Sequence, residues 1–126
     1  LVWRKPGSAA VPARQAERHD ASVLSYTLRF AAPLDWLAFC DALEILLQVH
    51  GSRILRIKGL LDIAGDPQPR VVQCVQHIAY PPSSLPAWPD AGPFADHHSR
   101  LVFIVRDLPR DDVASLLSAV IGQIPG

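Results

Sequence analysis

Apolar and polar residues alternate along residues 22–30, the pattern of a β-strand with one buried face. Residues 54–63 and 71–80 return to this period of two, and the turn-forming stretch between them predicts a hairpin. Residues 100–107 are continuously apolar through their middle, which predicts a fourth strand in a central or well-covered position. The side chains expected to face inward are Leu24, Tyr26, Leu28 and Phe30, then Leu55, Ile57, Leu61 and Ile63, then Val72, Cys74, Ile78 and Tyr80. Both faces of the third strand carry apolar residues, so a shift of one residue would reverse its assignment.

Two other segments repeat their apolar residues at steps of three and four, which predicts amphipathic helices. The first follows Pro33 and Asp35, which suit a helix start, and ends at Gly51. The second begins after Pro109 and carries acidic residues in its first turn. The recurring positions are Trp36, Phe39, Cys40, Leu43, Leu46, Leu47 and His50 in the first helix, and Val113, Leu116, Leu117, Val120 and Ile121 in the second.

The order of these elements is β-α-β-β-β-α. Two amphipathic helices and four strands, most of them with one polar face, predict an α+β fold of two layers. We expect a four-stranded, mostly antiparallel sheet with both helices on one face, which leaves the other face open to solvent or to a partner.

The remaining segments lack a period. Residues 1–18 mix Pro, Gly, Ala and Arg, which predicts an interdomain linker, with the domain itself covering residues 19–126. Residues 81–98 contain five prolines and form a loop of a length that is usually functional or mobile. The chain contains no methionine, so we expect it to be a piece of a longer protein.

Composition narrows the function classes. The 126 residues suffice for one domain, and twelve Lys and Arg balance twelve Asp and Glu, which argues against a nucleic-acid binder or a polybasic membrane-surface protein. No apolar run approaches the roughly 18 residues of a membrane span. Two cysteines do not make a disulfide framework, so we expect a reducing, cytoplasmic compartment.

Catalytic motifs are absent from the sequence. It has neither the G-x-x-x-x-G-K-[ST] phosphate loop nor the G-x-S-x-G nucleophile elbow. Cys40 and Cys74 fall at positions expected to be buried, where a cysteine acts as a small apolar side chain. We therefore expect no catalysis and no cofactor in this chain.

The outward face of the predicted sheet is the first candidate site. Polar and cationic side chains gather there, which suits a docking surface for another domain or an anionic group and equally suits an ordinary solvated face. These residues are Ser25, Thr27, Arg29, Arg56, Lys58, Gln73 and His77.

A metal site is the second candidate. Asp96, His97 and His98 are consecutive and could form a surface site, or the histidines could be solvated loop residues. Adjacent histidines on an extended loop point in different directions, and the spacing differs from that of structural zinc ligands.

Several segments, read in order, resemble a known family. The run RHDASVLSYTLRFAAPLDWLAF is similar to the start of the CobW C-terminal domain, and so is HGSRILRIKGLLDIAGDPQPRVVQCVQHIAY with its R-x-K-G-L-L and V-Q-x-V-Q-H motifs. The segments LPAWPD and SRLVFIVRDLP complete a resemblance that covers about residues 18–110. The sequence departs from the family at Cys74, where relatives often have Gly, and its short linker lacks the His-rich loop of many relatives.

The resemblance implies a parent protein of the P-loop GTPase class. CobW-type proteins join a GTPase domain to this smaller domain and act in metal insertion, in cobalamin biosynthesis or in zinc homeostasis. The parent is expected to use GTP, Mg²⁺ and a transition metal, Zn or Co. The phosphate loop, the Mg²⁺ ligands and the C-x-C-C motif of the GTPase domain do not occur in this sequence.

The hypothesis that follows is a non-catalytic, regulatory and partner-docking domain of a CobW-like, GTP-dependent metallochaperone. Its partners would be the GTPase domain of the same parent chain and a client metalloprotein, with no nucleic acid and no membrane. The expected contact residues are Arg56, Lys58, Gln73, His77 and Arg100.

Two alternatives stay open. The first is a direct metal-binding module that uses Asp96, His97 and His98, helped by His77. The second is a homo-oligomerising domain, because an open sheet edge can pair with another chain.

Overall fold

The computed structural model describes residues 22–126, so the predicted linker at 1–18 lies outside the described residues. Within these described residues, six strands, two α-helices and two short 3₁₀ helices follow one another. In order they are β1 (Val23–Phe30), α2 (Trp36–His50), η2 (Gly51–Arg53), β2 (Ile54–Leu61), β3 (Arg70–Val75), β4 (Ile78–Ala79), β5 (Ser83–Ser84), η3 (Pro93–Asp96), β6 (Ser99–Arg106) and α3 (Arg110–Ile121).

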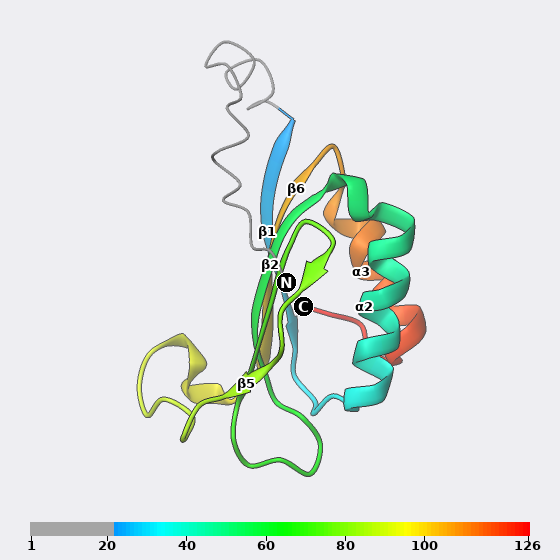
Figure 1. The fold of residues 1–126 in the computed structure, drawn as a ribbon. Coiled ribbons are helices and arrows are strands. Elements are labelled where there is room, and N and C mark those ends of the chain that lie inside the picture. Colours follow the sequence, from blue (N-terminus) through cyan, green and yellow to red (C-terminus); the bar gives the residue numbers. More distant parts are fainter. Residues whose placement is uncertain (1–21) are drawn as a thin grey trace.

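The strands form one sheet in the order β1-β6-β2-β3-β4, with β5 paired to β3, and every pairing of strands is antiparallel. Helices α2 and α3 lie side by side over one face of this sheet (Figure 1). The two-layer α+β prediction is therefore confirmed, and so is the central position of β6. The sheet has six strands rather than four because two short segments, β4 and β5, add to β3.

Helix α2 begins where its sequence predicts. The Asp35 carboxylate accepts a hydrogen bond from the Ala38 backbone N–H at 2.9 Å, which satisfies one of the free donors at the helix start. Phe39, Ala42 and Leu46 are buried at successive turns of the inner face. Helix α3 follows Pro109 as expected.

The core lies between the helices and the inner face of the sheet. Its largest fully buried side chains come from all three long strands and both helices, and from the short connections that bring the chain across the layers. They include Leu28, Phe30, Phe39, Leu46, Ile57, Leu61, Leu101, Phe103 and Leu117. Leu24, expected to face inward, is 40% exposed because it lies near the outer end of an edge strand.

The predicted facing of β2 is wrong at its start. Ile54 is buried and Leu55 is only half-buried, although the alternation assigned Leu55 to the core. The pairing with β6 shifts register between Ile54 and Arg56, so one extra residue interrupts the alternation there. From Ile57 onward the predicted facing is confirmed.

The predicted strand over 71–80 is also wrong in its second half. Strand β3 ends at Val75, and Gln76 and His77 turn the chain back so that β4 pairs antiparallel with β3. Gln76 has a φ of 55°, the left-handed conformation that such tight turns need. Val72 and Cys74 are buried as expected, but the turn removes His77 from the outward face of the sheet.

Within residues 22–126, neither helix is long and apolar enough to span a lipid bilayer.

Candidate functional site

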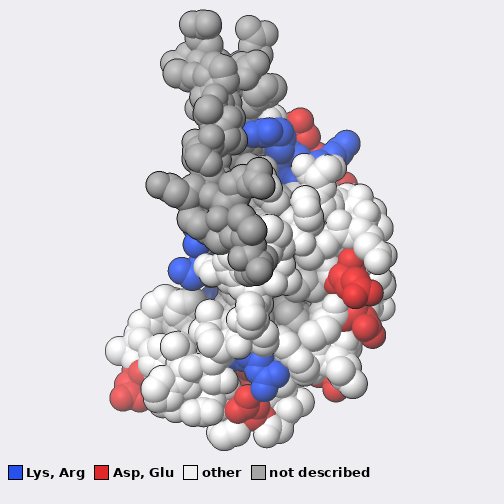
Figure 2. All heavy atoms as spheres, viewed as in Figure 1, with Lys and Arg blue, Asp and Glu red and all other residues white. Residues whose placement is uncertain are grey.

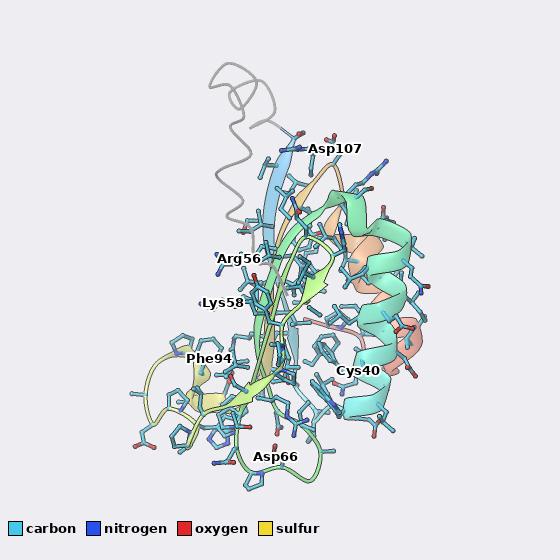
Figure 3. The ribbon with its side chains drawn as sticks, in the orientation of Figure 1. Cys40, Arg56, Lys58, Asp66, Phe94 and Asp107 are labelled. Carbon is cyan, nitrogen blue, oxygen red and sulfur yellow. The ribbon has the colours of Figure 1, made fainter. Side chains whose placement is uncertain are left out.

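Within the described part of the chain, the sheet face opposite α2 and α3 is covered at one end by the loop at 81–98 and is otherwise exposed; we call it the open face (Figure 3). The strand registers arrange its outward side chains in three neighbouring rows across β3, β2, β6 and β1. The rows are Val75, Arg56, Ile104 and Ser25; then Gln73, Lys58, Val102 and Thr27; then Val71, Leu60, Arg100 and Arg29.

This arrangement brings four of the five expected contact residues together. Arg56, Lys58, Gln73 and Arg100 occupy adjacent rows, and Arg56 Nη2 donates a hydrogen bond to Gln73 Oε1 at 3.3 Å. His77 lies apart from them in the turn between β3 and β4.

The cations of the open face differ in their partners. Arg100 donates two hydrogen bonds to the Asp96 carboxylate, at 2.8 Å and 2.7 Å, so its charge is neutralised by a bidentate pair. Arg56 and Lys58 are exposed and, within residues 22–126, neither has a carboxylate partner. Two positive charges of this surface are therefore left uncompensated.

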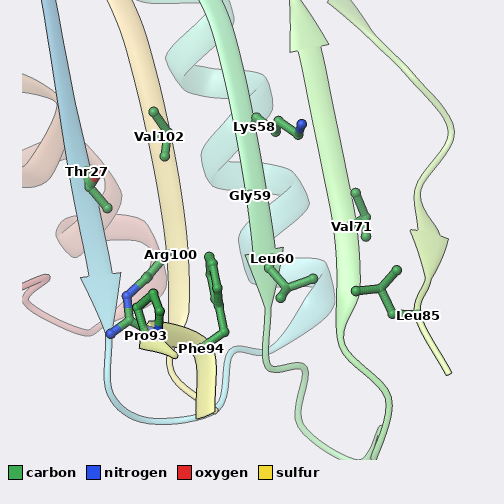
Figure 4. A pocket seen from close by; sticks show the side chains of 10 residues that line it. All are labelled: Thr27, Lys58, Gly59, Leu60, Val71, Leu85, Pro93, Phe94, Arg100 and Val102. Carbon is green, nitrogen blue, oxygen red and sulfur yellow. The ribbon is translucent and has the colours of Figure 1, made fainter. Parts of the chain in front are cut away.

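The open face is also hollowed. A cavity of about 420 Å³ lies between strands and loop (Figure 4). A smaller depression of about 240 Å³ continues from it along β2 and β6. The two share Lys58 and Val102, and we call them together the groove. The larger lobe is lined chiefly by Leu60, Val71, Leu85, Phe94 and Val102, and the smaller by Arg56, Lys58, Val102 and Ile104.

The loop at residues 81–98 supplies one wall of the larger lobe. Phe94, in η3, lies under the Arg100 guanidinium at 5.4 Å from the ring centroid, and the Asp96–Arg100 pair fixes η3 to β6. Directly after Asp96, at the same end of η3, His97 stacks on the buried Trp88 with ring centroids 5.0 Å apart. These contacts hold the wall in place.

The three metal-ligand candidates are divided between two environments. Asp96 Oδ2 lies 3.4 Å from His98 Nδ1, so these two residues meet. Arg29 Nη1 lies 2.7 Å from the same Nδ1 atom, and because a guanidinium only donates, Nδ1 accepts. His97 points away to Trp88. Among the described residues, no group of three or more His, Cys, Asp or Glu is placed to hold a metal ion.

The electrostatics of Asp96 favour its ionised form. Hydrogen bonds from Arg100, and next from the His98 backbone N–H, hold the pKa of this carboxyl well below its usual range. Its oxygens are therefore occupied by protein donors.

The two cysteines are poor nucleophiles. Burial raises the pKa of Cys74 to about 11, and burial followed by the charge of Asp41 raises the pKa of Cys40. Cys74 is buried as expected, while Cys40 is half-buried. Both thiols stay protonated at neutral pH.

Sequence reasoning missed the apolar part of the site. Leu60, Val71 and Val102 could have been found, because the same alternation that predicts the core side chains also predicts which apolar residues face outward. Leu85 and Phe94 could not, because they come from a loop without a period that folds against the sheet.

Comparisons with known proteins agree with this fold. The family model described as "Cobalamin synthesis protein cobW C-terminal domain" matches residues 23–121. The Zn(II)-bound YjiA GTPase from E. coli is similar with a TM-score of 0.66 and 25% identity, over 95% of this chain and 35% of that chain. A Zn(II)-bound triple mutant of the YjiA GTPase gives a TM-score of 0.67 and 27% identity, over 79% of this chain and 30% of that chain.

Among proteins of curated function, none matches this chain. The chain spans about a third of the length of the two GTPases to which it is similar. Its family match covers the sheet, both helices and every residue of the groove. This chain belongs to the family of CobW C-terminal domains.

Proposed function

We propose that this chain is the regulatory and docking domain of a CobW-like, GTP-dependent metallochaperone, and that its open face contacts the GTPase domain of the same parent protein. Family membership and the similarity to two zinc-bound GTPases support the parent class. The observation that carries the docking role is the open face itself, where uncompensated cations border an apolar groove.

The apolar surface on this face supports docking over simple solvation. Val102 lies on the central strand of the sheet and is 40% exposed, and Leu85 at the rim of the groove is 38% exposed. Contiguous apolar surface rimmed by polar residues is a mark of an interaction site in soluble proteins. A covering domain would remove these side chains from water.

Regulation would act through this contact. If the GTPase domain presents different surfaces in its GTP-bound and GDP-bound states, its affinity for the open face differs between them, and nucleotide state and docking become coupled. GTP, Mg²⁺ and the transported Zn or Co would be held by the GTPase domain. In this proposal, a client metalloprotein binds the parent protein when the contact between the GTPase domain and the open face changes.

The test is a double charge reversal, Arg56→Glu with Lys58→Glu. We expect it to weaken binding of this domain to the purified GTPase domain of the parent by about tenfold or more, because two attractive contacts become repulsive. Titration calorimetry measures the affinity, and circular dichroism shows that the variant stays folded, since both side chains are exposed.

The matched control is Asp41→Lys with Glu44→Lys, two exposed residues on the opposite layer in α2. It also reverses two charges, so the net charge changes by the same size in the opposite direction, but it leaves the open face intact. Equal affinity of the wild-type domain and the Arg56/Lys58 variant would refute the docking role.

A second candidate, direct metal binding by the 96–98 segment, has one contact in its favour, the approach of Asp96 to His98. The same two side chains are engaged by Arg100 and Arg29. We therefore favour the docking function. The free thiols of Cys40 and Cys74 agree with a cytoplasmic setting for either function.

A further inference from the structure

We propose that the groove binds an acidic, amphipathic helix of the partner, with two apolar side chains one turn apart in its lobes and a flanking carboxylate paired with Lys58. The inference rests on the proposed docking function and specifies the chemistry of the surface that docks. It follows from the shape, the spacing and the charge of the groove.

Shape indicates that the site takes apolar side chains. The larger lobe, about 420 Å³, falls in the size range of binding pockets, and its floor is formed by Leu60, Val71 and Val102. Phe94 and Leu85 form its walls (Figure 4). A large aliphatic or aromatic side chain would contact apolar atoms on several sides.

The wall is preformed, which lowers the cost of binding. Arg100 clamps η3 through Asp96 and lies over the Phe94 ring, and Trp88 packs on His97 at the end of the same loop. A site that is ordered before binding does not lose this conformational entropy when the partner arrives.

Spacing favours a helix. Val102 lines both lobes of the groove, and Ile104 lines the smaller lobe. These two outward residues are two positions apart on β6, which corresponds to about 7 Å along a strand. Residues at i and i+4 of a helix are about 6 Å apart along its axis and share one face. Within residues 22–126, α2 and α3 cover one face of the antiparallel sheet, so a helix of a partner can approach the other face.

Charge favours an acidic partner. Within residues 22–126 the strands contain Arg and Lys but no Asp or Glu, and no carboxylate lines either lobe. Lys58 borders both lobes and has no ion-pair partner among the described residues, with Arg56 beside it. A carboxylate on the flank of the helix would pair with Lys58, whereas a cation there would be repelled.

Charge argues against one of two other occupants and is compatible with the other. The sequence at 1–21 carries more basic than acidic side chains, so it does not complement the groove. The outer face of α2 does, since it presents the exposed Leu37 and Val49 with Asp41 and Glu44. A second copy seated by this face would form a head-to-tail contact that need not close, so association would grow with concentration.

The experiment titrates the ¹⁵N-labelled chain 1–126 with a synthetic Ala-rich helical peptide that carries Phe and Leu four residues apart and Glu on the flank. A matched peptide has Lys in place of Glu. We expect shifts of the amide signals of Lys58, Leu60, Phe94 and Val102 at peptide concentrations up to about 1 mM, and at least about fivefold weaker binding of the Lys peptide.

Two variants locate the contact. Val102→Asp and, independently, Phe94→Ser should each weaken binding of the acidic peptide at least about fivefold, and Leu37→Asp on the far layer should not. The proposal fails if the acidic peptide leaves the spectrum unchanged, if shifts appear on α2 or α3, or if the Lys peptide binds equally. It fails also if analytical ultracentrifugation shows growing oligomers that both Val102→Asp and Leu37→Asp abolish.

The same variants separate this inference from the docking function. If the GTPase domain binds wild-type and Val102→Asp chains equally, the docking function can stand and the helix-binding groove is refuted. If the GTPase domain binds neither, while the acidic peptide still binds the groove, the assignment of the partner is refuted and the chemistry of the groove stands.

Discussion

At the scale of single residues, Gly59 in β2 allows close packing of β2 against β6. A Cβ atom built at this position would lie 2.5 Å from Leu101 Cδ2 and 2.8 Å from the Arg100 carbonyl oxygen. Gly59 therefore lets β2 lie close against β6 while Leu101 covers it from the core side. The groove depends on this approach, because both strands line it.

We expect Gly59→Ala to lower the free energy of unfolding by about 1–3 kcal/mol, since the added methyl group meets backbone and a core side chain that cannot both move. Urea denaturation followed by circular dichroism measures the change. The control is Gly51→Ala, where no atom lies within 4 Å and the backbone is already right-handed helical. That variant should be neutral or stabilising by up to about 1 kcal/mol, and equal destabilisation of the two would contradict the argument.

Single residues also show what the sequence can predict of the site. The period of two is enough to predict that Arg56, Lys58 and Gln73 share one face, and the registers put them in adjacent rows. His77 is misplaced by the same rule, because Gln76 and His77 are not typical turn residues and nothing local signals the reversal. The rule is reliable only while a strand continues.

At the scale of elements, the loop at 81–98 is held by side-chain contacts to β6 and within the loop, rather than by a regular hydrophobic pattern. Arg100 on β6 holds η3 through Asp96, and η3 in turn presents Phe94 to the groove. A loop of this kind has no period to read. Its structure could not be predicted because no pattern in the sequence marks which pairs meet, although Asp96 and Arg100 are only four residues apart and Trp88 stacks on His97 within the loop.

The Asp96–Arg100 pair makes the order of this loop depend on pH. The folded-state pKa of Asp96 is depressed, so its contribution is complete above the ordinary aspartate value near 4 and is lost as pH falls through the lower folded value. In the wild-type chain, ¹⁵N relaxation should show an ordered Phe94 amide at pH 6 and a progressively more mobile one as the pH falls below about 4.

Asp96→Asn should make the Phe94 amide mobile throughout this pH range, because the neutral amide cannot replace the charged bidentate pair. The matched control is Asp66→Asn, which removes a similar pair with Arg70 in the turn before β3. It should leave Phe94 unaffected. An Asp96→Asn chain with wild-type order in η3 would show that Trp88 and the other loop contacts suffice.

The helices and strands themselves were largely predictable, with two exceptions of one kind. Residues 36–50 and 110–121 have periods and start signals that agree, so local pattern and tertiary structure point to the same result. The bulge after Ile54 and the turn after Val75 each change the register by a local event. Alternation cannot reveal such events, because both faces carry apolar residues at these points.

At the scale of the whole molecule, the balanced net charge conceals an uneven distribution. The strands carry Lys and Arg without Asp or Glu, whereas α2 carries Asp41 and Glu44 without Lys or Arg. Figure 2 shows blue atoms at the left of the view and red atoms at the right, over the helices, with further red atoms at the lower left and both colours at the top and bottom. Net charge alone argues against polyanionic partners, but the fold creates one cationic face that suits a local acidic surface.

Direct metal binding can be tested on the chain 1–126. We expect Zn²⁺ and Co²⁺ titrations by calorimetry to show only weak binding, because Asp96 and His98 are engaged by arginines and His97 stacks on Trp88. The control is the variant His97→Ala with His98→Ala, which should behave like the wild-type chain. Tight binding at one site that this variant abolishes would instead establish the direct metal-binding function.

The central position of β6 also orders events in time. Within residues 22–126, β6 is the last strand to be made and β1 pairs with β6 alone, so Tyr26 must wait for Leu108, 82 residues later, before their hydrogen bond can form. At about 5–20 residues per second, that interval on the ribosome is roughly 4–16 s. Since β6 supplies Arg100, Val102 and Ile104, the groove cannot form on a nascent chain before β6 has been made. A partner that recognises the groove thereby recognises only domains in which β6 has been made and has paired.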